Sequence, residues 1–400
     1  MKYQYIRDFK NLGYGLFVHF GPYSVLGKGE WAKEVYQIPD AEYEPYARKF
    51  NPTKTWAKNL VKTAKQAGAR YITLTTRHHD GFSLFDTKGL SDYDIATTQN
   101  GRDLVREFVD ECNKQGIIPF FYHTLIDWHH PDFKNNFPKY MDYLISSVEI
   151  LCTNYGKIGG LWFDGMWNNW NADWQEDRLY GTIRKYQPNA MIINNTGMHK
   201  MGQLGHIEID SITFERGKPG SALNNCGKPL ATEMCQVFNS HWGIANGDIN
   251  YKSINQILED LVDCRSCDSN YLLNVGPQGN GELRLIDKAY LLEVAKFIKL
   301  NKNKIYKFKS CDIQAENATV VKDDEDNYYA IIKNVEMMVE PNIFVDSGEA
   351  RLVKILNANI KNVKWLDNNE TVPYKKNSFY VKPFYYGTNY CIRIAKFKIK

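Results

Sequence analysis

Short apolar runs alternate with amphipathic stretches over the first three quarters of the chain. Between several of the runs lie helical patterns, such as residues 55–69 and 101–116, that close with glycine as helix C-termini often do. Continuous apolar strands that alternate with helices predict a parallel sheet covered by helices, and about 300 residues suit a (β/α)8-like barrel. The runs predicted as strands are 15–21, 71–76, 117–122, 160–163, 191–194, 230–234 and 271–275.

The pattern changes after Cys311. Short segments rich in β-branched and aromatic residues follow one another there, separated by Asp, Asn, Gly and Lys. Such segments are typical of a small all-β domain, which we predict to be a sandwich. The division into domains is therefore predicted as 1–305 for the barrel and 306–400 for the β-sandwich.

Polar side chains stand where the predicted barrel strands end. The carboxyl ends of the strands in such a barrel converge on one face, so we expect these side chains to share one pocket. No glycine-rich phosphate loop follows the first strand, which disfavours a nucleotide-binding doubly wound sheet. The strand-end residues are His19, Arg77, His78, His79, Asp80, Tyr122, His123, Asp164, Asn194, Asn195, Glu233 and Asn274.

Charge and aromatic composition narrow the choice of ligand. The 50 Lys and Arg against 46 Asp and Glu give a net charge of +4, without a dense basic run. We therefore expect neither nucleic acid nor a membrane as partner, and a neutral small molecule or sugar as ligand. All nine His lie at or before His241, and eight of the nine Trp at or before Trp242, so the chemistry belongs to the barrel.

The N-terminal residues and the cysteines bear on location and on metals. The first 20 residues mix charged with apolar side chains, and no run of about 18 apolar residues occurs, so we expect a soluble, cytoplasmic protein. Eight scattered cysteines fit free thiols in a reducing compartment. Cys264 and Cys267 have the spacing of half a zinc site, but no second pair accompanies them, and we expect no metal.

Asp164 is the first candidate for chemistry. It follows an apolar run and is flanked by Trp162, Trp167, Trp170 and Trp174, whose rings could stack on a sugar. Burial beside indoles raises the pKa of a carboxyl, whereas a nucleophile must be ionised, so donors from neighbouring strand ends should attend it. An Asp before Gly is also a common turn residue.

Paired histidines are the second candidate. His78 and His79 could bind a metal, but adjacent side chains on a strand face opposite sides, and neutral imidazoles also suit sugar hydroxyls. His129 and His130 repeat the pattern after the next strand, where surface loop residues are the alternative.

Cleavage of a glycosidic bond needs a second carboxyl group across the bond. Glu208, Glu215 and Glu233 are the acids in the right part of the chain. An ion pair between Glu215 and Arg216 would lower the pKa that a general acid needs, so Arg216 would have to point away. Glu233 lies within a run, where a buried structural role is equally compatible. The local sequence leaves this choice open.

Several motifs together resemble a known family. The resemblance extends over about residues 12–300 and is to the α-L-fucosidases of glycoside hydrolase family 29. The motifs are GLFVHFGPYSV, GEW, TLTTRHHDGFSLFDT, FYHTLIDWHHP, LWFDG, TFE, TEMCQVFNSHWGI and NYLLNVGPQGNGEL, in this order.

The resemblance implies a retaining hydrolase that removes terminal α-L-fucose from a fucosylated oligosaccharide or glycoconjugate, without metal or cofactor. Asp164 would be the nucleophile and Glu215 the acid/base, with Glu233 as the alternative. The substrate-binding residues it implies are His19, Glu30, Trp31, His78, His79, Tyr122, Trp162 and Trp242.

One departure and two competing functions accompany this hypothesis. Many family members carry an Arg after the fifth strand, where this chain reads Asn194-Asn195-Thr196, and we expect Arg216 to take its place. One competing function is a non-catalytic carbohydrate-binding protein on the same barrel. The other is a metal-dependent barrel hydrolase that uses His78, His79, His129 and Asp164.

Overall fold

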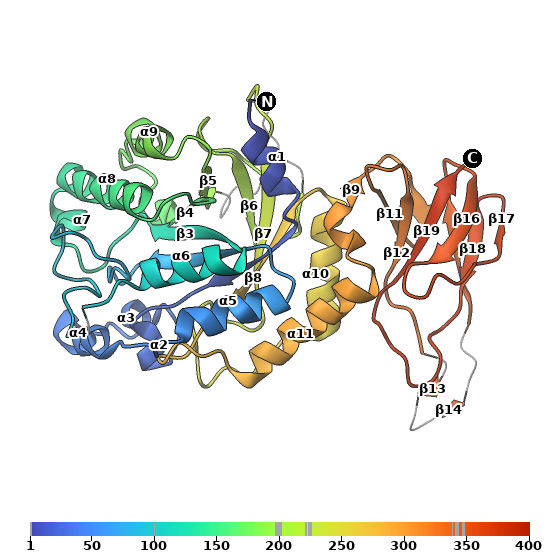
Figure 1. The fold of residues 1–400 in the computed structure, drawn as a ribbon, viewed down its shortest axis with the longest axis horizontal. Coiled ribbons are helices and arrows are strands. Elements are labelled where there is room, and N and C mark those ends of the chain that lie inside the picture. Colours follow the sequence, from blue (N-terminus) through green and yellow to red (C-terminus); the bar gives the residue numbers. More distant parts are fainter. Residues whose placement is uncertain are drawn as a thin grey trace. The chain divides into compact units, whose positions relative to one another are not determined.

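The chain forms two compact units in a computed structural model (Figure 1). The structure describes residues 2–99, 101–196, 202–220, 222, 226–337, 339–340, 344–345 and 349–400. The first unit consists of Met1–Tyr251 and Asn270–Leu291, and the second of Lys252–Ser269 and Leu292–Lys400. The second unit therefore includes helix α10 (Ile254–Ser266) and part of α11 (Leu285–Leu300), while the division at residues 305/306 stays a prediction.

Eight parallel strands close into a barrel in the first unit, which confirms the predicted fold class. Each strand pairs with the next in chain order, and the last pairs with the first. The strands are β1 (Tyr14–Val18), β2 (Tyr71–Arg77), β3 (Ile118–Thr124), β4 (Gly160–Asp164), β5 (Met191–Asn194), β6 (Ser211–Glu215), β7 (Ala231–Val237) and β8 (Asn270–Val275).

Strand β6 is missing from the seven predicted runs, so the sixth and seventh of those runs are β7 and β8. Its sequence alternates polar Ser211, Thr213 and Glu215 with apolar Ile212 and Phe214, and every position but the last is buried. A strand whose inward positions are polar does not produce a continuous apolar run. The strand end predicted at Glu233 is also wrong, because this residue lies inside β7.

Helices connect the strands on the outside of the barrel. Helix α6 shows how the sequence fixes one: the Asp103 side chain accepts a hydrogen bond from the Arg106 amide at its start, and Gly116 ends it with φ 74°. The helices and short helical turns of this unit are α1 (Gln4–Lys10), α2 (Tyr23–Leu26), α3 (Ala32–Val35), α4 (Asp40–Lys49), α5 (Trp56–Gln66), α6 (Leu104–Gln115), α7 (Pro131–Asn135), α8 (Phe137–Asn154), η1 (Met166–Asn168) and α9 (Glu176–Tyr186).

Large side chains fill the barrel interior below the carboxyl ends of the strands. They form one buried cluster, and glycines leave space for them: a Cβ atom at Gly160 would lie 2.5 Å from the Met191 carbonyl oxygen. The cluster includes Phe17, Tyr71, Phe120, Tyr122, Trp162, Met191, Ile193, Cys235 and Leu272.

The second unit contains the predicted β-rich segment. A five-stranded sheet has the order β16-β19-β12-β11-β9, a four-stranded sheet the order β10-β15-β18-β17, and both contribute to one hydrophobic core. The strands and a short helical turn are η3 (Lys304–Lys307), β9 (Lys309–Ser310), β10 (Ala315–Glu316), β11 (Thr319–Lys322), β12 (Tyr328–Ile332), β13 (Val339–Glu340), β14 (Phe344–Val345), β15 (Arg351–Ile355), β16 (Ile360–Trp365), β17 (Tyr374–Lys375), β18 (Ser378–Val381) and β19 (Arg393–Ile399).

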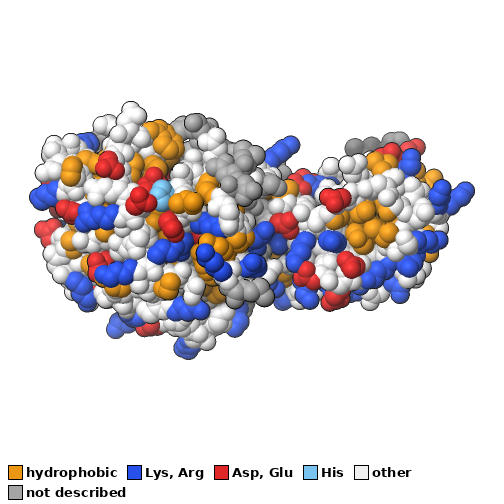
Figure 2. Space-filling view, turned by 90° about the horizontal axis from the view of Figure 1, so that it is seen from above, with side chains coloured by type: hydrophobic (Ala, Val, Ile, Leu, Met, Phe, Trp, Pro, Cys, Tyr) orange, Lys and Arg blue, Asp and Glu red, His pale blue; other side chains and the backbone are white. Residues whose placement is uncertain are grey.

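The surface mixes both signs of charge. On the face seen in Figure 2, Lys and Arg side chains are interspersed with Asp and Glu. Within the described ranges, no helix has the length and apolar character that crossing a membrane requires.

Replacing Gly160 with alanine should destabilise the barrel by ~1–3 kcal/mol, because the added methyl group overlaps the backbone of β5. At Gly181, inside α9, an added Cβ atom would have no neighbour within 4 Å. Gly181→Ala should therefore stabilise by ~0.5–1 kcal/mol, the usual gain for this change inside a helix. Thermal unfolding of both variants tests this, and equal melting temperatures would contradict the packing argument.

Candidate active site

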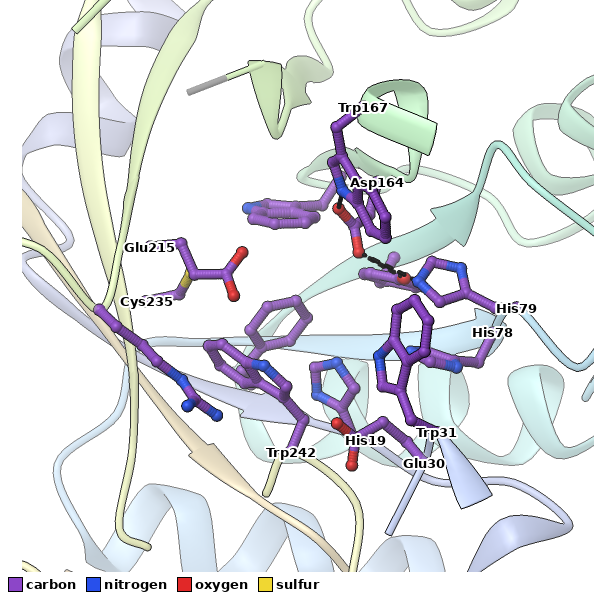
Figure 3. A pocket seen from close by; sticks show the side chains of 14 residues that line it. His19, Glu30, Trp31, His78, His79, Asp164, Trp167, Glu215, Cys235 and Trp242 are labelled. Atoms are coloured by element: carbon purple, nitrogen blue, oxygen red, sulfur yellow. Dashed lines mark hydrogen bonds and ion pairs between the residues drawn. The ribbon is translucent and has the colours of Figure 1, made fainter. Parts of the chain in front are cut away.

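A pocket of about 320 Å³ opens at the carboxyl ends of the barrel strands (Figure 3). This volume is at the small end of ligand pockets and suits a single sugar ring. The two catalytic and eight substrate-binding residues that the family resemblance implies all lie in its wall, whereas the alternative Glu233 does not. The lining residues are Phe17, His19, Glu30, Trp31, His78, His79, Tyr122, Trp162, Asp164, Trp167, Glu215, Arg216, Cys235 and Trp242.

The two-residue repeat of the strands decides which side chains reach the pocket. Trp162 and Asp164 both line it from β4, and Phe17 on β1 is followed two positions later by His19. Residues at i and i+2 face the same side of a strand. Once the barrel closes, residues far apart in the sequence therefore meet in one cavity.

The predicted strand-end residues that do not line the pocket include Arg77, Asp80, His123 and Asn194. Arg77 contacts Tyr143 and His123 in the buried interior, and Asp80 accepts a hydrogen bond from the Tyr43 hydroxyl at 2.8 Å. The fourth, Asn194, donates to the Tyr180 hydroxyl at 2.7 Å. The expectation that these residues share the pocket was wrong. Strand positions alternate in direction, and the side chains of Arg77, His123 and Asn194 turn outwards from the barrel to contact α8 and α9. Asp80 lies in the loop after β2.

Three donors surround the carboxylate of Asp164. Its Oδ1 accepts hydrogen bonds from the Trp167 indole at 3.1 Å and from the Asn195 amide at 3.2 Å. Its Oδ2 accepts one from the Tyr122 hydroxyl at 3.0 Å, and the Nε2 atom of His79 lies 3.5 Å away. Donors of this kind stabilise the ionised form of a carboxyl. Of the expected His and Asn donors, Asn195 takes this role, and Trp167 and Tyr122 supply the other two hydrogen bonds.

The Glu215 carboxyl points into the same cavity as that of Asp164 (Figure 3). Burial, followed by the negative charge of Asp164, raises the pKa of Glu215 to about 7, against the lowering effects of Asn195 and Arg216. Arg216 lies with its guanidinium 5.1 Å from the centre of the Trp242 ring and donates to the Ser240 carbonyl at 2.8 Å. These two partners hold the Arg216 guanidinium at the pocket wall. An ion pair with Glu215, which would favour the ionised form of that carboxyl, is thereby avoided.

One amide nitrogen joins the two carboxyls. The Nδ2 atom of Asn195 lies 3.2 Å from Asp164 Oδ1 and 2.6 Å from Glu215 Oε2. The two oxygens can therefore be no more than about 5.8 Å apart, the sum of these distances. Carboxyls about 5–5.5 Å apart are typical of retaining glycosidases, whereas inverting enzymes need about 6.5–9.5 Å.

Three histidines in the wall are neutral. Burial lowers the pKa of His19 to about 3 and that of His79 to about 4, and it also lowers the pKa of His78 well below its usual value. A neutral imidazole offers one donor and one acceptor, which is the combination that a sugar hydroxyl can use.

Hydrogen bonds fix the tautomer of His19. Asn274 donates through Nδ2 to the Trp242 carbonyl at 2.7 Å, so its Oδ1, 2.7 Å from His19 Nδ1, is the acceptor. The proton of His19 is therefore on Nδ1, and Nε2 remains free to accept. In the same way, Thr124 gives its proton to the Ile126 carbonyl and accepts from Nδ1 of His79.

Glu30 and Trp31 complete the wall from the segment before α3. The Glu30 carboxyl is buried, which raises its pKa, and it accepts a hydrogen bond from the Gly243 amide at 2.7 Å. Trp31 packs on Trp167 with ring centres 5.8 Å apart and on Trp128 at 5.0 Å. The aromatic side of the pocket is therefore braced by contacts behind it.

Glu233 is buried in the barrel interior and does not line the pocket. Its carboxyl accepts hydrogen bonds from the Tyr71 hydroxyl and from the Trp162 indole, the latter at 3.0 Å. Burial raises its pKa to about 7. Both carboxyl oxygens of Glu233 therefore already accept a hydrogen bond, and the bond from the indole holds Trp162 in place. These are the contacts of a structural residue.

The four residues of the metal alternative are not gathered around one point. The His129 ring stacks on Tyr93 at 3.8 Å outside the pocket wall, while His130 caps α7 through its Nδ1 atom. In the part of the chain that the structure describes, no three His, Cys, Asp or Glu side chains are placed to hold a metal ion.

Sequence reasoning missed Phe17 and Cys235 in the wall and Asn195 as a bridge. The two-residue repeat could have identified Phe17, two positions before His19, and Cys235, two positions after Glu233. No local signal marks Asn195 as different from Asn194, because the distinction depends on which one faces the pocket.

Comparisons with known proteins agree with this geometry. The model of the α-L-fucosidase protein family matches residues 2–303 of the chain. The structure of α-L-fucosidase isoenzyme 1 from Paenibacillus thiaminolyticus is similar with a TM-score of 0.84 and 30% identity, over 99% of both chains. The α-L-fucosidase AlfC from Lactobacillus casei, solved in complex with α-L-fucose product, has a TM-score of 0.66 and 28% identity, over 75% of this chain and 99% of its own.

Curated sequences give the same result. Tissue α-L-fucosidase from Rattus norvegicus is 28% identical over 351 residues, which are 79% of this chain and 73% of the relative. The chain spans 65% to 74% of the length of such relatives. Since the family model covers three quarters of the chain, the protein belongs to the α-L-fucosidase family and is a glycoside hydrolase.

Proposed function

We propose that the protein is a retaining exo-glycosidase that hydrolyses terminal α-L-fucosyl linkages of oligosaccharides or glycoconjugates by double displacement. The observation that carries the proposal is the pair of carboxyls, Asp164 and Glu215, which one Asn195 amide bridges at 3.2 and 2.6 Å. Membership of the α-L-fucosidase family and the α-L-fucose bound by the Lactobacillus casei relative support the choice of sugar.

In the first step, the Asp164 carboxylate attacks the anomeric carbon and forms a glycosyl ester. The bond from that carbon to the leaving oxygen breaks, and the leaving oxygen takes the proton of Glu215. The neutral carboxyl of Glu215 thereby becomes a carboxylate, and the negative charge of Asp164 disappears into the ester.

In the second step, the Glu215 carboxylate removes a proton from water as the water oxygen attacks the anomeric carbon. The ester bond breaks, Asp164 regains its charge, and fucose leaves with the configuration it had in the substrate. Two carboxyls accomplish both steps, so the proposed chemistry calls for neither a metal nor a cofactor.

The protonation states of the free site suit these steps. Hydrogen bonds from Tyr122, Trp167 and Asn195 favour the charged form of Asp164. A pKa of about 7 keeps a large fraction of Glu215 protonated near neutral pH. A general acid works best when its pKa lies near the working pH.

The remaining wall residues would bind the sugar. Neutral His19, His78 and His79, with Glu30, are placed to exchange hydrogen bonds with hydroxyl groups. The rings of Trp31, Tyr122, Trp162 and Trp242 supply apolar faces, and we propose that Arg216 contacts the substrate beside Trp242.

Glu215 is preferred over Glu233 as acid/base because of access. Glu215 lines the cavity, whereas both oxygens of Glu233 already accept hydrogen bonds in the barrel interior. A general acid has to come within hydrogen-bond reach of the leaving oxygen.

Asp164→Ala should lower kcat by several orders of magnitude on every fucoside, because no nucleophile remains. Azide should restore turnover and yield the β-fucosyl azide, since a small anion can attack from the vacated side. Product analysis by NMR checks this, with Asp110→Ala on the exposed face of α6 as a control that keeps full activity. An Asp164→Ala variant with near-normal kcat would contradict the nucleophile assignment.

Glu215→Ala should show a strong dependence on the leaving group. The loss of kcat/KM, which reports the first step, should be small for an aryl fucoside, whose phenolate leaves without protonation, and large for a fucosylated oligosaccharide. Kinetics on both substrates, compared with Glu233→Gln, make the measurement. If Glu233→Gln shows this dependence and Glu215→Ala does not, the acid/base is Glu233.

The pH profile of kcat/KM on an oligosaccharide should fall on the alkaline side from about pH 7. Burial and the Asp164 charge raise the pKa of Glu215 to about 7, and the first step needs its protonated form, so activity is lost as pH rises through that value. The alkaline limb should persist in Glu233→Gln and be absent in Glu215→Gln. An unchanged limb in Glu215→Gln would assign it to another group.

A further inference from the structure

Asn195 is held in one orientation by a second residue that does not touch the pocket. The hydroxyl of Thr213 donates to the Oδ1 atom of Asn195 at 2.9 Å, and both side chains are buried. Because Oδ1 is occupied as an acceptor, the Nδ2 atom with its two protons must face the carboxyls of Asp164 and Glu215.

The backbone also fixes the place of Asn195. It follows β5 directly, and its amide donates to the Phe163 carbonyl of β4 at 2.9 Å, next to Asp164. Thr213 stands two positions before Glu215 on β6, so the two side chains face the same side of that strand. Asn195 and Thr213 thus tie β4, β5 and β6 together at the point where the two carboxyls meet.

We propose that Asn195, oriented by Thr213, is a positioning residue that holds the two carboxyls at their working distance and supports whichever of them is charged. This inference rests on the proposed function, since it assigns the negative charge to Asp164 before the first step and to Glu215 after it.

The physical reason lies in the movement of that charge. Hydrogen bonds to a carboxylate are roughly twice as strong as those to a neutral group. An amide with one N–H directed at each carboxyl can therefore stabilise the charge on Asp164 in the free enzyme and on Glu215 in the glycosyl ester without turning. Dipoles that are already in place cost no reorganisation during the reaction.

Other charged and titratable groups near Glu215 cannot do the same. Asp164 and Glu30 repel its carboxylate, and Arg216 attracts it but is occupied by Ser240 and Trp242. Tyr122 from β3 and Cys235 from β7 also interact electrostatically with Glu215, and burial together with nearby carboxylates raises the pKa of both. Asn195 is the group that donates to both carboxyls in the described part of the pocket.

The test compares Asn195→Ala, Thr213→Val and Thr213→Ser, with kcat and KM measured against pH on a fucosylated oligosaccharide. Asn195→Ala should lower kcat by about 10- to 100-fold, the effect of misplacing reacting groups, while KM changes by less than about threefold. The alkaline limb should move to higher pH, because the Glu215 carboxylate loses a donor that lowers its pKa.

Thr213→Val should move the limb in the same direction, since the freed amide can turn its oxygen towards the carboxyls. Thr213→Ser keeps the hydroxyl and should match the parent protein. Because Thr213 acts through Asn195, the double variant Asn195→Ala/Thr213→Val should be no worse than Asn195→Ala alone. Melting temperatures of all variants separate loss of folding from loss of function.

Two results would overturn the inference: an alkaline limb that stays in place in both Asn195→Ala and Thr213→Val, or effects on kcat that multiply in the double variant. Failure of the proposed function has a different signature, because the limb would then persist in Glu215→Gln. If the limb disappears in Glu215→Gln but does not move in the Asn195 and Thr213 variants, only the positioning role is lost.

Discussion

The electrostatic repulsion between Asp164 and Glu215 governs the rest of the site. Two carboxyls within about 6 Å in a largely buried cavity do not readily carry charge at the same time. The surroundings resolve the conflict by giving Asp164 several donors and leaving Glu215 with a pKa near 7. The neutral histidines add no positive charge that would pull Glu215 back towards the ionised form.

Closure of the barrel is what brings these groups together. Asp164 ends β4, Asn195 follows β5, and Glu215 ends β6, so three neighbouring strands present the chemistry side by side. The interior cluster beneath them includes Trp162, which Glu233 holds by a hydrogen bond. The pocket floor is therefore part of the hydrophobic core, and its geometry is as rigid as the packing below it.

Much of this arrangement could be predicted from the sequence, because apolar runs followed by polar residues identify barrel strands and their ends. Strand β6 escaped detection because its inward positions are polar. Glu233 was misplaced at a strand end because β7 continues beyond it to Val237. The separate fates of Asn194 and Asn195 depend on side-chain direction at the end of β5, which the sequence pattern did not resolve. The choice between Glu215 and Glu233 required knowing which carboxyl has access to the cavity.

The neutral imidazoles have a consequence for how the enzyme responds to its surroundings. His19 and His79 lose their protons at about pH 3 and 4, so they keep one hydrogen-bonding pattern throughout the mildly acidic and neutral range. Acidification of a compartment would then alter the rate of bond cleavage through Glu215 while leaving the histidine contribution to sugar recognition intact. Recognition and reactivity are in this respect separately tuned within one small cavity.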